Sequence, residues 1–232
     1  MNKTALITGA SSGIGLALAE QMIANDYEVI GVARDFSAVA QPGLNMQSLD
    51  LSNVDHLPKQ LSANDAFNDA VDVLVLNAGY GQFGGIEQFS HQQIRAMVDT
   101  NLVSNLFLIK HFLPKMKASG SGDIVIVGSE SALQGGKNGA VYCATKFALR
   151  GLAQSLRQDC STSNIRVILV NPGPVSSDFF DTLNFEPQDG VEFVIEPDQI
   201  ASVIVNALLQ PANVVCDEIN VQPLKRSFKK KR

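Results

Sequence analysis

MNKTALITGASSGIGLALAEQMIA, residues 1–24, contains three glycines between two apolar segments. The apolar run Ala5–Ile7 predicts a buried strand over residues 3–8. After Gly13 apolar residues recur at every fourth position, which predicts an amphipathic helix that ends near Ala24. The chain therefore opens with a strand, a glycine-rich turn and a helix.

The same stretch has some features of a secretory signal, because a lysine precedes mostly apolar and small residues. Thr8, Ser11 and Ser12 interrupt any continuous apolar region, and Lys3 supplies the only positive charge. A signal peptide needs both features, so we interpret the segment as part of the folded domain.

Beyond this opening, apolar strand-like runs alternate with segments of helical periodicity. Helices are predicted over 54–61, 90–116, 141–160 and 198–209, and strands over 29–33, 44–49, 71–76, 124–127, 167–170 and 218–221. Ser90 followed by Gln93 has the pattern of a helix capping box. The alternation predicts one α/β domain over residues 1–222, a doubly wound parallel sheet of about seven strands with helices on both faces. The polar stretch 174–195 is predicted to be a long functional loop.

Composition limits the partners and the cellular location. The chain has 232 residues, 45% of them hydrophobic, a net charge of −5, and three widely spaced cysteines. The charge gives no reason to expect a nucleic acid or a membrane surface as partner. No apolar run is long enough to span a bilayer, and the odd cysteine count favours a reducing compartment, so a cytoplasmic protein is expected. The basic tail 223–232 is predicted to be disordered, with an acidic partner as the alternative.

The segment TGASSGIG, residues 8–15, lies where a dinucleotide-binding fold places its phosphate turn. Glycines allow a sharp turn and close approach of a pyrophosphate, and the following helix offers unpaired N–H groups. Three glycines also occur in plain tight turns, so the position between a strand and a helix carries the argument.

The spacing G-x-x-x-G-x-G resembles the turn of the classical short-chain dehydrogenase/reductase family. Further matches follow in that family's order: the Asn-Ala-Gly at 77–79, Asn101, Ser129, the Tyr-x-x-x-Lys at 142–146, and a Pro-Gly turn at 172–173. Leu76 and Gly128 depart from the family pattern, at positions that bear on local hydrogen bonding. Together the matches cover most of residues 1–222.

The resemblance implies a Rossmann-type oxidoreductase that interconverts a carbonyl and a secondary alcohol with NAD(P)(H). It implies cofactor contacts from Gly9, Ser11, Ser12, Gly13, Ile14, Gly15, Arg34, Asp50, Leu51, Asn77, Ala78, Gly79, Tyr142, Lys146, Pro172, Gly173, Val175 and Ser177.

The chemistry expected of the motif residues follows from their side chains. Tyrosine and lysine four residues apart lie on one helix face. To move a proton near neutrality, a phenol of pKa ~10 needs a shift of about three units, or ~4 kcal/mol. One ammonium about 4 Å away supplies ~4 kcal/mol at an effective dielectric of ~20. Tyr142 is therefore the predicted general acid/base, Lys146 lowers its pKa, and Ser129 orients the substrate oxygen. By resemblance, Lys146 also binds the nicotinamide ribose and Asn101 holds a water chain.

Cofactor preference depends on the end of the second strand. Arg34 follows that strand and is suited to pair with a 2′-phosphate, so NADP(H) is favoured over NAD(H). Asp35 leaves the alternative open, because a shift of one residue would place a carboxylate against the ribose hydroxyls of NAD.

The substrate is not fixed by the sequence beyond a small molecule with a carbonyl or hydroxyl group, and long-chain and acyl-carrier substrates stay open. One alternative function is a non-catalytic NADP-binding regulator, and a more remote one is a methyltransferase-like sheet. By resemblance, we expect a homodimer or homotetramer that pairs through helices 90–116 and 141–160. The candidate pocket residues are Tyr80, Phe83, Glu130, Gln134, Asn138, Phe179 and Phe180.

Overall fold

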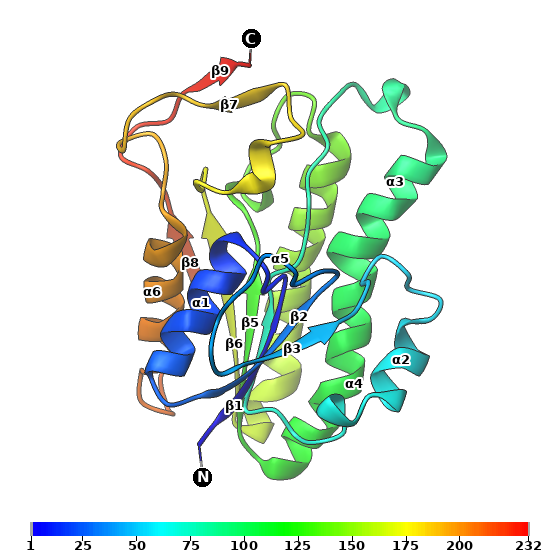
Figure 1. Cartoon of the computed structure of the whole chain (residues 1–232), viewed down its shortest axis with the longest axis vertical. Coiled ribbons are helices and arrows are strands. Elements are labelled where there is room, and N and C mark those ends of the chain that lie inside the picture. Colours follow the sequence, from blue (N-terminus) through cyan, green and yellow to red (C-terminus); the bar gives the residue numbers. More distant parts are fainter. Residues whose placement is uncertain (1, 232) are drawn as a thin grey trace.

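The computed structural model describes residues 2–231 of the chain. Its centre is a seven-stranded parallel sheet in the order β3-β2-β1-β4-β5-β6-β8, shown in Figure 1. The order reverses between β1 and β4, so the predicted doubly wound sheet is confirmed. The strands are β1 (Thr4–Thr8), β2 (Glu28–Ala33), β3 (Leu44–Ser48), β4 (Val73–Leu76), β5 (Gly122–Val127), β6 (Ile165–Pro172) and β8 (Glu218–Val221).

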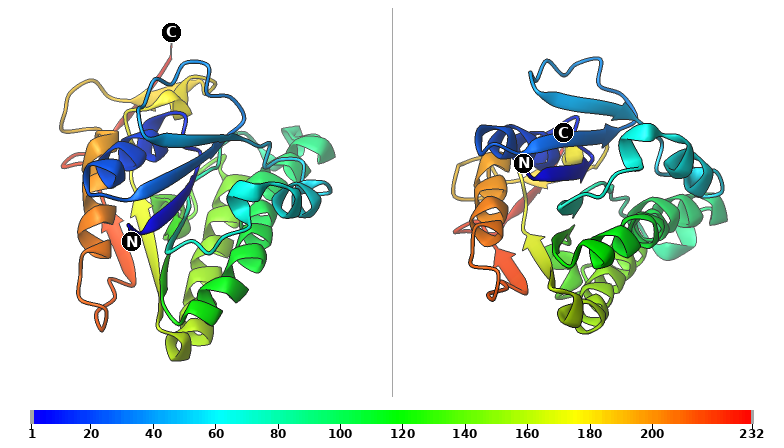
Figure 2. Two further views of the ribbon diagram at one scale, coloured as in Figure 1. Left: turned by 60° about the horizontal axis from the view of Figure 1, so that its bottom comes forward. Right: turned by 90° about the horizontal axis from the view of Figure 1, so that it is seen from below.

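Helices cover both faces of this sheet (Figure 2). Helices α1 (Gly13–Ala24) and α6 (Pro197–Leu208) pack on one face, and α2 (Leu57–Ala63), α4 (Ser104–Ser119) and α5 (Ala140–Cys160) pack on the other. Alternate strand residues point to opposite faces, so Leu6 joins the core under α4 and α5 while Ala5 and Ile7 join the core under α1 and α6. The five inner strands are buried on both faces, which explains why they are mostly apolar, whereas the edge strands β3 and β8 are partly exposed and carry polar residues.

The helix predicted over residues 90–116 contains an unexpected irregularity. It consists of α3 (His91–Val98), a π-helical turn η3 (Asp99–Val103), and α4. The predicted capping box is present, since the Ser90 hydroxyl accepts from the Gln93 amide at 3.2 Å and the Gln93 side chain accepts from the Ser90 amide at 2.9 Å. Such turns are rare and collect at functional sites, and this one contains Asn101.

The basic tail, which the sequence predicted to be disordered, includes a short strand in the structure. Residues Phe228–Lys230 form β9, which pairs antiparallel with β7 (Phe185–Pro187) in the long loop after β6. The tail gains backbone partners there, together with acidic side chains that its own charge attracts. Four short 3-10 turns complete the regular structure around the sheet, and a fifth lies in the long loop: η1 (Asp65–Phe67), η2 (Ile86–Gln88), η4 (Glu130–Ala132), η5 (Ser161–Ser163) and η6 (Asp178–Phe180).

Within residues 2–231, no helix is both long and apolar enough to cross a bilayer.

Candidate active site

The glycine turn at the carboxyl end of β1 has a backbone that tolerates no side chain at three positions. Gly9 and Gly13 have φ of +67° and +53°. A Cβ on Gly15 would lie 2.1 Å from the Gly9 carbonyl oxygen, and one on Gly9 would lie 2.9 Å from the Asn77 side-chain nitrogen. The three predicted glycines are therefore required by the close approach of the chain to itself.

Two polar side chains hold this turn against the end of β4. The Asn77 amide nitrogen donates to the carbonyl oxygens of Thr8 at 2.9 Å and Gly9 at 3.3 Å. The Thr8 hydroxyl accepts from the amides of Asn77 and Ala78, both at 3.0 Å, and donates to the Val75 carbonyl at 3.2 Å. Asn77 and Ala78 thus lie beside the turn as predicted, and the Asn77 side chain supports it.

The first turn of α1 is open toward the space beside the glycines. Ser12 is the N-cap residue, its side chain makes no capping hydrogen bond, and it is exposed. Opposite it, a Cβ on Gly13 would meet the Ser177 side chain at 3.3 Å. A bare helix N-terminus above a side-chain-free cradle is the arrangement that accepts a pyrophosphate, so the residues present fit a dinucleotide.

Arg34 and Asp35, on which cofactor preference depends, differ in how they are engaged. Arg34 is exposed at the end of β2. The Asp35 carboxylate accepts from the amide and the hydroxyl of Ser37, both at 2.8 Å, and these bonds hold its pKa below the usual value. The Asp35 carboxylate is therefore engaged within its own loop, while the Arg34 side chain is exposed and its charge acts on Tyr80.

After β3, Asp50 is arranged in a similar way to Asp35. Its carboxylate accepts from the Ser52 amide at 3.0 Å and hydroxyl at 2.8 Å. Leu51 beside it is buried.

Tyr142, Ser129 and Lys146 meet at the carboxyl end of β5. Tyr142 and Lys146 are one turn apart on α5 and are only 6% and 5% exposed. The Lys146 Nζ lies 5.8 Å from the Tyr142 ring centroid and donates to the Val127 carbonyl at 3.1 Å. The Ser129 hydroxyl accepts from the Ser131 amide at 3.1 Å. The three residues are therefore adjacent, as the spacing predicted.

Burial shifts the pKa values of this pair away from each other. It raises the pKa of Tyr142 to about 12, although a hydrogen bond with Ser129 lowers it in part. It lowers the pKa of Lys146 to about 8. The sequence led us to expect that Lys146 would depress the phenol pKa. The loss of solvation instead outweighs the hydrogen bond with Ser129, and the pKa of the phenol rises.

Asn101 joins this group through the π-helical turn. Its side chain accepts from the Tyr80 amide at 3.0 Å and donates to the Tyr80 carbonyl at 2.8 Å and to the Thr145 hydroxyl at 3.2 Å. A Cβ on Gly79 would stand 3.2 Å from the Asn101 oxygen and 3.7 Å from the Lys146 Nζ. Gly79, Asn101 and Lys146 thus converge on one point, and a side chain at Gly79 would crowd it.

Asn171 supports Ser129 in a way that sequence analysis missed. Its side-chain oxygen accepts from the Ser129 amide at 3.3 Å, and its nitrogen donates to Glu218 at 3.2 Å and Asn220 at 2.9 Å in β8. A Cβ on Gly128 would lie 2.1 Å from the same oxygen. The departure of Gly128 from the family pattern was the available signal, because the missing side chain leaves room for Asn171.

The candidate substrate residues divide into two sets. Phe83 and Phe179 pack on the Tyr142 ring, with centroids 5.3 and 5.8 Å away, and Phe180 packs on Phe179. Glu130 pairs with Arg226 of the tail at 2.9 Å. Tyr80 packs against the hydrophobic cluster of Met97, Val141 and Tyr142, and its backbone is held by Asn101. Gln134 and Asn138 are exposed.

Side chains that were not predicted as substrate residues also pack among the aromatic rings near Tyr142. Sequence analysis missed Phe185, Phe228 and Arg226, since nothing in their local pattern places a terminal segment near Tyr142.

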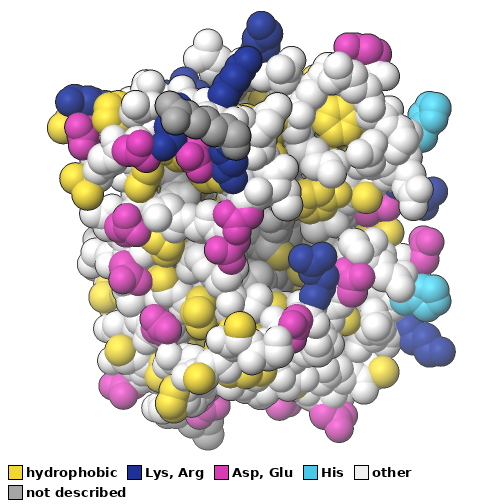
Figure 3. Space-filling model, turned by 45° about the horizontal axis from the view of Figure 1, so that its top comes forward, with side chains coloured by type: hydrophobic (Ala, Val, Ile, Leu, Met, Phe, Trp, Pro, Cys, Tyr) yellow, Lys and Arg dark blue, Asp and Glu magenta, His cyan; other side chains and the backbone are white. Residues whose placement is uncertain are grey.

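The loop after β6 lines a cavity of about 460 Å³. Its lining includes Val175, Ser177, Phe180, Glu186 and Lys231, and Ser177 is also the side chain that a Cβ on Gly13 would meet. Pro172 and Gly173 end β6 and lead into this loop. Figure 3 shows the molecule tilted so that this end of the sheet comes forward, with basic and acidic side chains gathered side by side and the surface hollowed between them.

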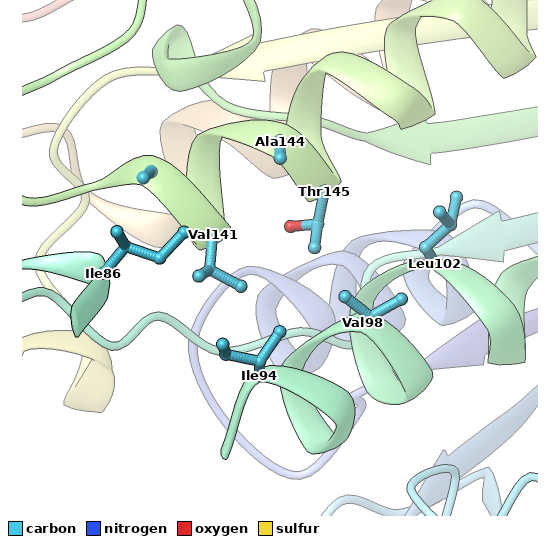
Figure 4. Close-up of a pocket in the computed structure, with 8 residues that line it drawn as sticks. Ile86, Ile94, Val98, Leu102, Val141, Ala144 and Thr145 are labelled. Carbon is cyan, nitrogen blue, oxygen red and sulfur yellow. The ribbon is translucent and has the colours of Figure 1, made fainter. Parts of the chain in front are cut away.

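A second cavity, of about 290 Å³, lies on the outside of the helices and does not border the glycine turn (Figure 4). Its lining is apolar and includes Ile94 and Val98 of α3, Leu102 of η3, and Val141 of α5. It is a groove between helices rather than a part of the site around Tyr142.

No group of His, Cys, Asp or Glu within residues 2–231 has the clustering needed to hold a metal ion. The side chains that meet at the end of β5 are a phenol, a hydroxyl and an ammonium, those of Tyr142, Ser129 and Lys146.

The sequence model of the short chain dehydrogenase family matches residues 3–188. The chain belongs to this family. It is 31% identical over 232 residues to an uncharacterised oxidoreductase of Staphylococcus epidermidis, covering 96% of this chain and 97% of that one. It is 33% identical over 197 residues to human 17-beta-hydroxysteroid dehydrogenase type 1 and 39% identical over 189 residues to human retinol dehydrogenase 8. These matches cover 79% and 76% of this short-chain dehydrogenase but only 60% of each human protein.

Solved structures agree with this assignment. An alcohol dehydrogenase from Thermococcus sibiricus in complex with 5-hydroxy-NADP superposes with a TM-score of 0.84 at 27% identity, covering 98% of this chain and 99% of that one. A metagenomic short-chain oxidoreductase in complex with NADP has a TM-score of 0.77 at 29% identity and covers 95% and 96% of the two chains. The protein is therefore an oxidoreductase of the short-chain dehydrogenase/reductase family that uses a nicotinamide dinucleotide.

Proposed function

We propose that this short-chain dehydrogenase interconverts a carbonyl compound and its secondary alcohol with NADP(H), using Tyr142 as the general acid/base. The observation that carries the proposal is the convergence of Tyr142, Ser129, Lys146 and Asn101 at the mouth of a cradle that fits a dinucleotide. A protein that only sensed the cofactor would have no need of a buried phenol beside a buried ammonium.

The bound nicotinamide would supply or accept the hydride at the substrate carbon. In the reductive direction the Tyr142 phenol donates its proton to the carbonyl oxygen, and the Ser129 hydroxyl donates a hydrogen bond to that same oxygen. The Lys146 ammonium then stabilises the phenolate left behind. The Asn101 side chain fixes the Tyr80 segment and the Thr145 hydroxyl next to the lysine.

The free Tyr142 phenol, with its pKa raised by burial, holds its proton firmly at neutral pH. Proton transfer therefore needs an additional positive charge, or a hydrogen-bond partner that stabilises the phenolate, to lower this pKa. A bound oxidised nicotinamide carries such a positive charge. This explains why we place the active form of the site in the cofactor complex.

NADP(H) is favoured because Arg34 is exposed while Asp35 is occupied by Ser37. An arginine there pairs with a 2′-phosphate, whereas a carboxylate already holding two hydrogen bonds is less available to ribose hydroxyls. The dinucleotides named with the Thermococcus sibiricus and metagenomic structures are of the NADP type, which supports the same preference. The names of the human relatives, which specify a hydroxysteroid and retinol, support an alcohol or carbonyl substrate.

The test is oxidation of NADPH and of NADH against a panel of aldehydes, ketones, 3-oxo acids and acyl thioesters. We expect turnover that prefers NADPH and falls at least about 1000-fold in Tyr142→Phe, because only the proton donor is removed. Tyr27→Phe, which removes a hydroxyl at the start of β2, is the matched control and is expected to keep full activity. Binding of NADPH without any turnover across the panel would instead favour the non-catalytic regulator.

We infer that the protein assembles as a homodimer or homotetramer. Leu106 on α4 and Phe147 on α5 are large, apolar and 40% and 43% exposed, and the apolar groove of Figure 4 lies between α3 and α5. Pairing of the same helices from two copies would cover these side chains on both. A monomeric mass in sedimentation would contradict it.

The three free cysteines support a reducing, cytoplasmic location.

A further inference from the structure

The aromatic rings near Tyr142 form a continuous chain that ends in the C-terminal tail. Phe83 lies 5.3 Å from Tyr142 and 5.1 Å from Phe185, measured between ring centroids. Phe185 lies 5.6 Å from Phe228 of β9, and Phe180 lies 6.1 and 6.3 Å from these two. Phe179 closes the chain back to Tyr142. These separations are those of aromatic pairs in direct contact.

The tail is held in this place by its backbone. β9 pairs with β7 in a register that sets Phe228 opposite Pro187 and Lys230 opposite Phe185. Hydrogen bonds extend the pairing at both ends, from the Lys231 amide to the Asn184 carbonyl at 3.0 Å and from the Gln188 amide to the Ser227 carbonyl at 3.0 Å. A two-stranded ribbon alone is marginally stable, so further contacts are needed to hold it closed.

Those contacts are ionic, and they join the basic tail to the acidic loop. Lys229 pairs with Glu186 at 3.4 Å and Lys225 with Glu192 at 3.5 Å. Arg226 pairs with Glu130, which follows Ser129 directly. Each exposed pair is weak by itself, but the set closes one strand onto one loop at several points. We call residues 174–195 together with 225–231 the lid.

The lid therefore covers Tyr142 with hydrocarbon. The Tyr142 side chain is buried under Phe83 and Phe179, and Lys225, Arg226 and Lys229 of the tail are paired with carboxylates of the loop or of Glu130. Lys231 Nζ donates to the Phe180 carbonyl at 2.6 Å instead. A charged substrate group placed among the rings would lose its solvation and gain no ionic partner from them. Rings that pack against one another instead match a flat apolar molecule.

We propose that the tail forms the outer wall of the substrate site, with Phe228 and Phe185 selecting a bulky, uncharged aromatic or polycyclic carbonyl or alcohol. The inference rests on the proposed function and adds its substrate class. Phe228 acts on specificity, because it lies two rings away from Tyr142 and touches the substrate only beyond the reacting carbon. Opening of the lid admits the substrate, and closure replaces ring–ring contacts with ring–substrate contacts.

The test compares 2-acetylnaphthalene with butanone, in the intact protein and in Phe228→Ala. We expect kcat/KM for 2-acetylnaphthalene to exceed that for butanone, and Phe228→Ala to reduce this preference about tenfold or more, through KM. Activity on butanone is expected to stay within about twofold. The matched control is Leu224→Ala, because Leu224 is a large apolar side chain that directly precedes the tail part of the lid and is 88% exposed. An unchanged preference, or an equal loss for both ketones, would overturn the inference.

A second readout separates this inference from the proposed function. Hydrogen exchange of residues 185–187 and 228–230 is measured in the NADPH complex with and without 2-acetylnaphthalene. We expect the ketone to slow exchange in the intact protein and in Leu224→Ala but not in Phe228→Ala. If no ketone turns over yet this protection is found, the proposed reaction fails and the lid stands. If turnover is found but the ketone leaves exchange at both strands unchanged, the reaction stands and the lid inference fails.

Discussion

The glycine turn after β1 and the lid both border the proposed active site, but they keep their shape by different means. The turn is held by backbone atoms and by Thr8 and Asn77, within distances that leave no room for a methyl group at Gly9 or Gly15. The lid is held by a three-residue strand pair, stacked rings and exposed ion pairs.

This difference matches what each region is proposed to bind. A pyrophosphate is the same in every reaction of a nicotinamide enzyme, so a fixed cradle suits it. A substrate must enter and leave, and the region that admits it is drawn from contacts of low local stability. The comparison predicts that substitutions in the turn act on all ligands, while substitutions in the lid act on some of them.

The largest effect is expected for Gly15→Ala. The new Cβ would collide with the Gly9 carbonyl oxygen, so the turn must move by more than a side chain could absorb. We expect the Kd of both NADPH and NADH to rise more than about 100-fold and the Tm to fall, while hydrogen exchange in β7 is unchanged. Fluorescence titration and a thermal melt measure this.

The matched control for this change is Gly151→Ala on α5, where no atom lies within 4 Å of the new Cβ. Alanine is favoured over glycine within a helix, so this variant is expected to be neutral or to gain up to about 1 kcal/mol. If Gly151→Ala also weakened dinucleotide binding, the glycine turn would be no more sensitive to an added methyl group than α5 is.

A smaller effect is expected for Lys146→Met, which lies between the two regions. Burial lowers the pKa of Lys146 from 10.5 to about 8, so between these pH values the unfolded chain binds more protons than the folded one. The stability of the intact protein therefore rises with pH in that window, and the buried charge costs most below pH 8. We expect Lys146→Met to raise the unfolding free energy at pH 7 by about 2 kcal/mol, after loss of its hydrogen bond to Val127.

Urea unfolding at pH 7 and at pH 10.5 checks this, because the gain should vanish at the higher pH. Lys59→Met, at an exposed position on α2, should give no pH-dependent gain. A stabilisation of Lys146→Met that was equal at both pH values would show that packing, and not removal of a buried charge, is responsible.

The smallest effect is expected for Arg34→Ala. Loss of one guanidinium should raise the Kd of NADPH about tenfold and leave that of NADH within about twofold, since only a 2′-phosphate partner is removed. Arg95→Ala removes an arginine with a 72% exposed side chain on α3 and should alter neither. Equal weakening of both dinucleotides by Arg34→Ala would favour the alternative in which Asp35 reads the ribose of NAD.

The glycine turn and the strands could be predicted because their signals are local. Apolar runs such as Val73–Leu76 and glycines at fixed offsets report on neighbouring atoms, and the structure confirms the sheet they predicted. Ser129, Tyr142 and Lys146 were found because they keep fixed spacing within one strand–helix unit.

The lid could not be predicted in the same way. β7 and β9 are each three residues long, and Glu186 and Lys229 meet across a separation that no local pattern reports. A run of basic residues has the same composition whether it is free or paired with a distant acidic loop. The pKa of Tyr142 was missed for a related reason, because its burial depends on Phe83 and Phe179 from two other segments.

The π-helical turn at 99–103 makes the position of Asn101 depend on the length of the chain there. A π turn holds one residue more than an α turn, so a chain lacking one residue here could run as an uninterrupted α-helix from α3 into α4. The residues on one side of the deletion would rotate by about 100° relative to those on the other. The Asn101 amide would turn away from Tyr80 and Thr145, yet the helix would lose none of its regularity. Regular helix formation thus gives no reason to keep the extra residue, whereas the Asn101 hydrogen bonds to Tyr80 and Thr145 require it.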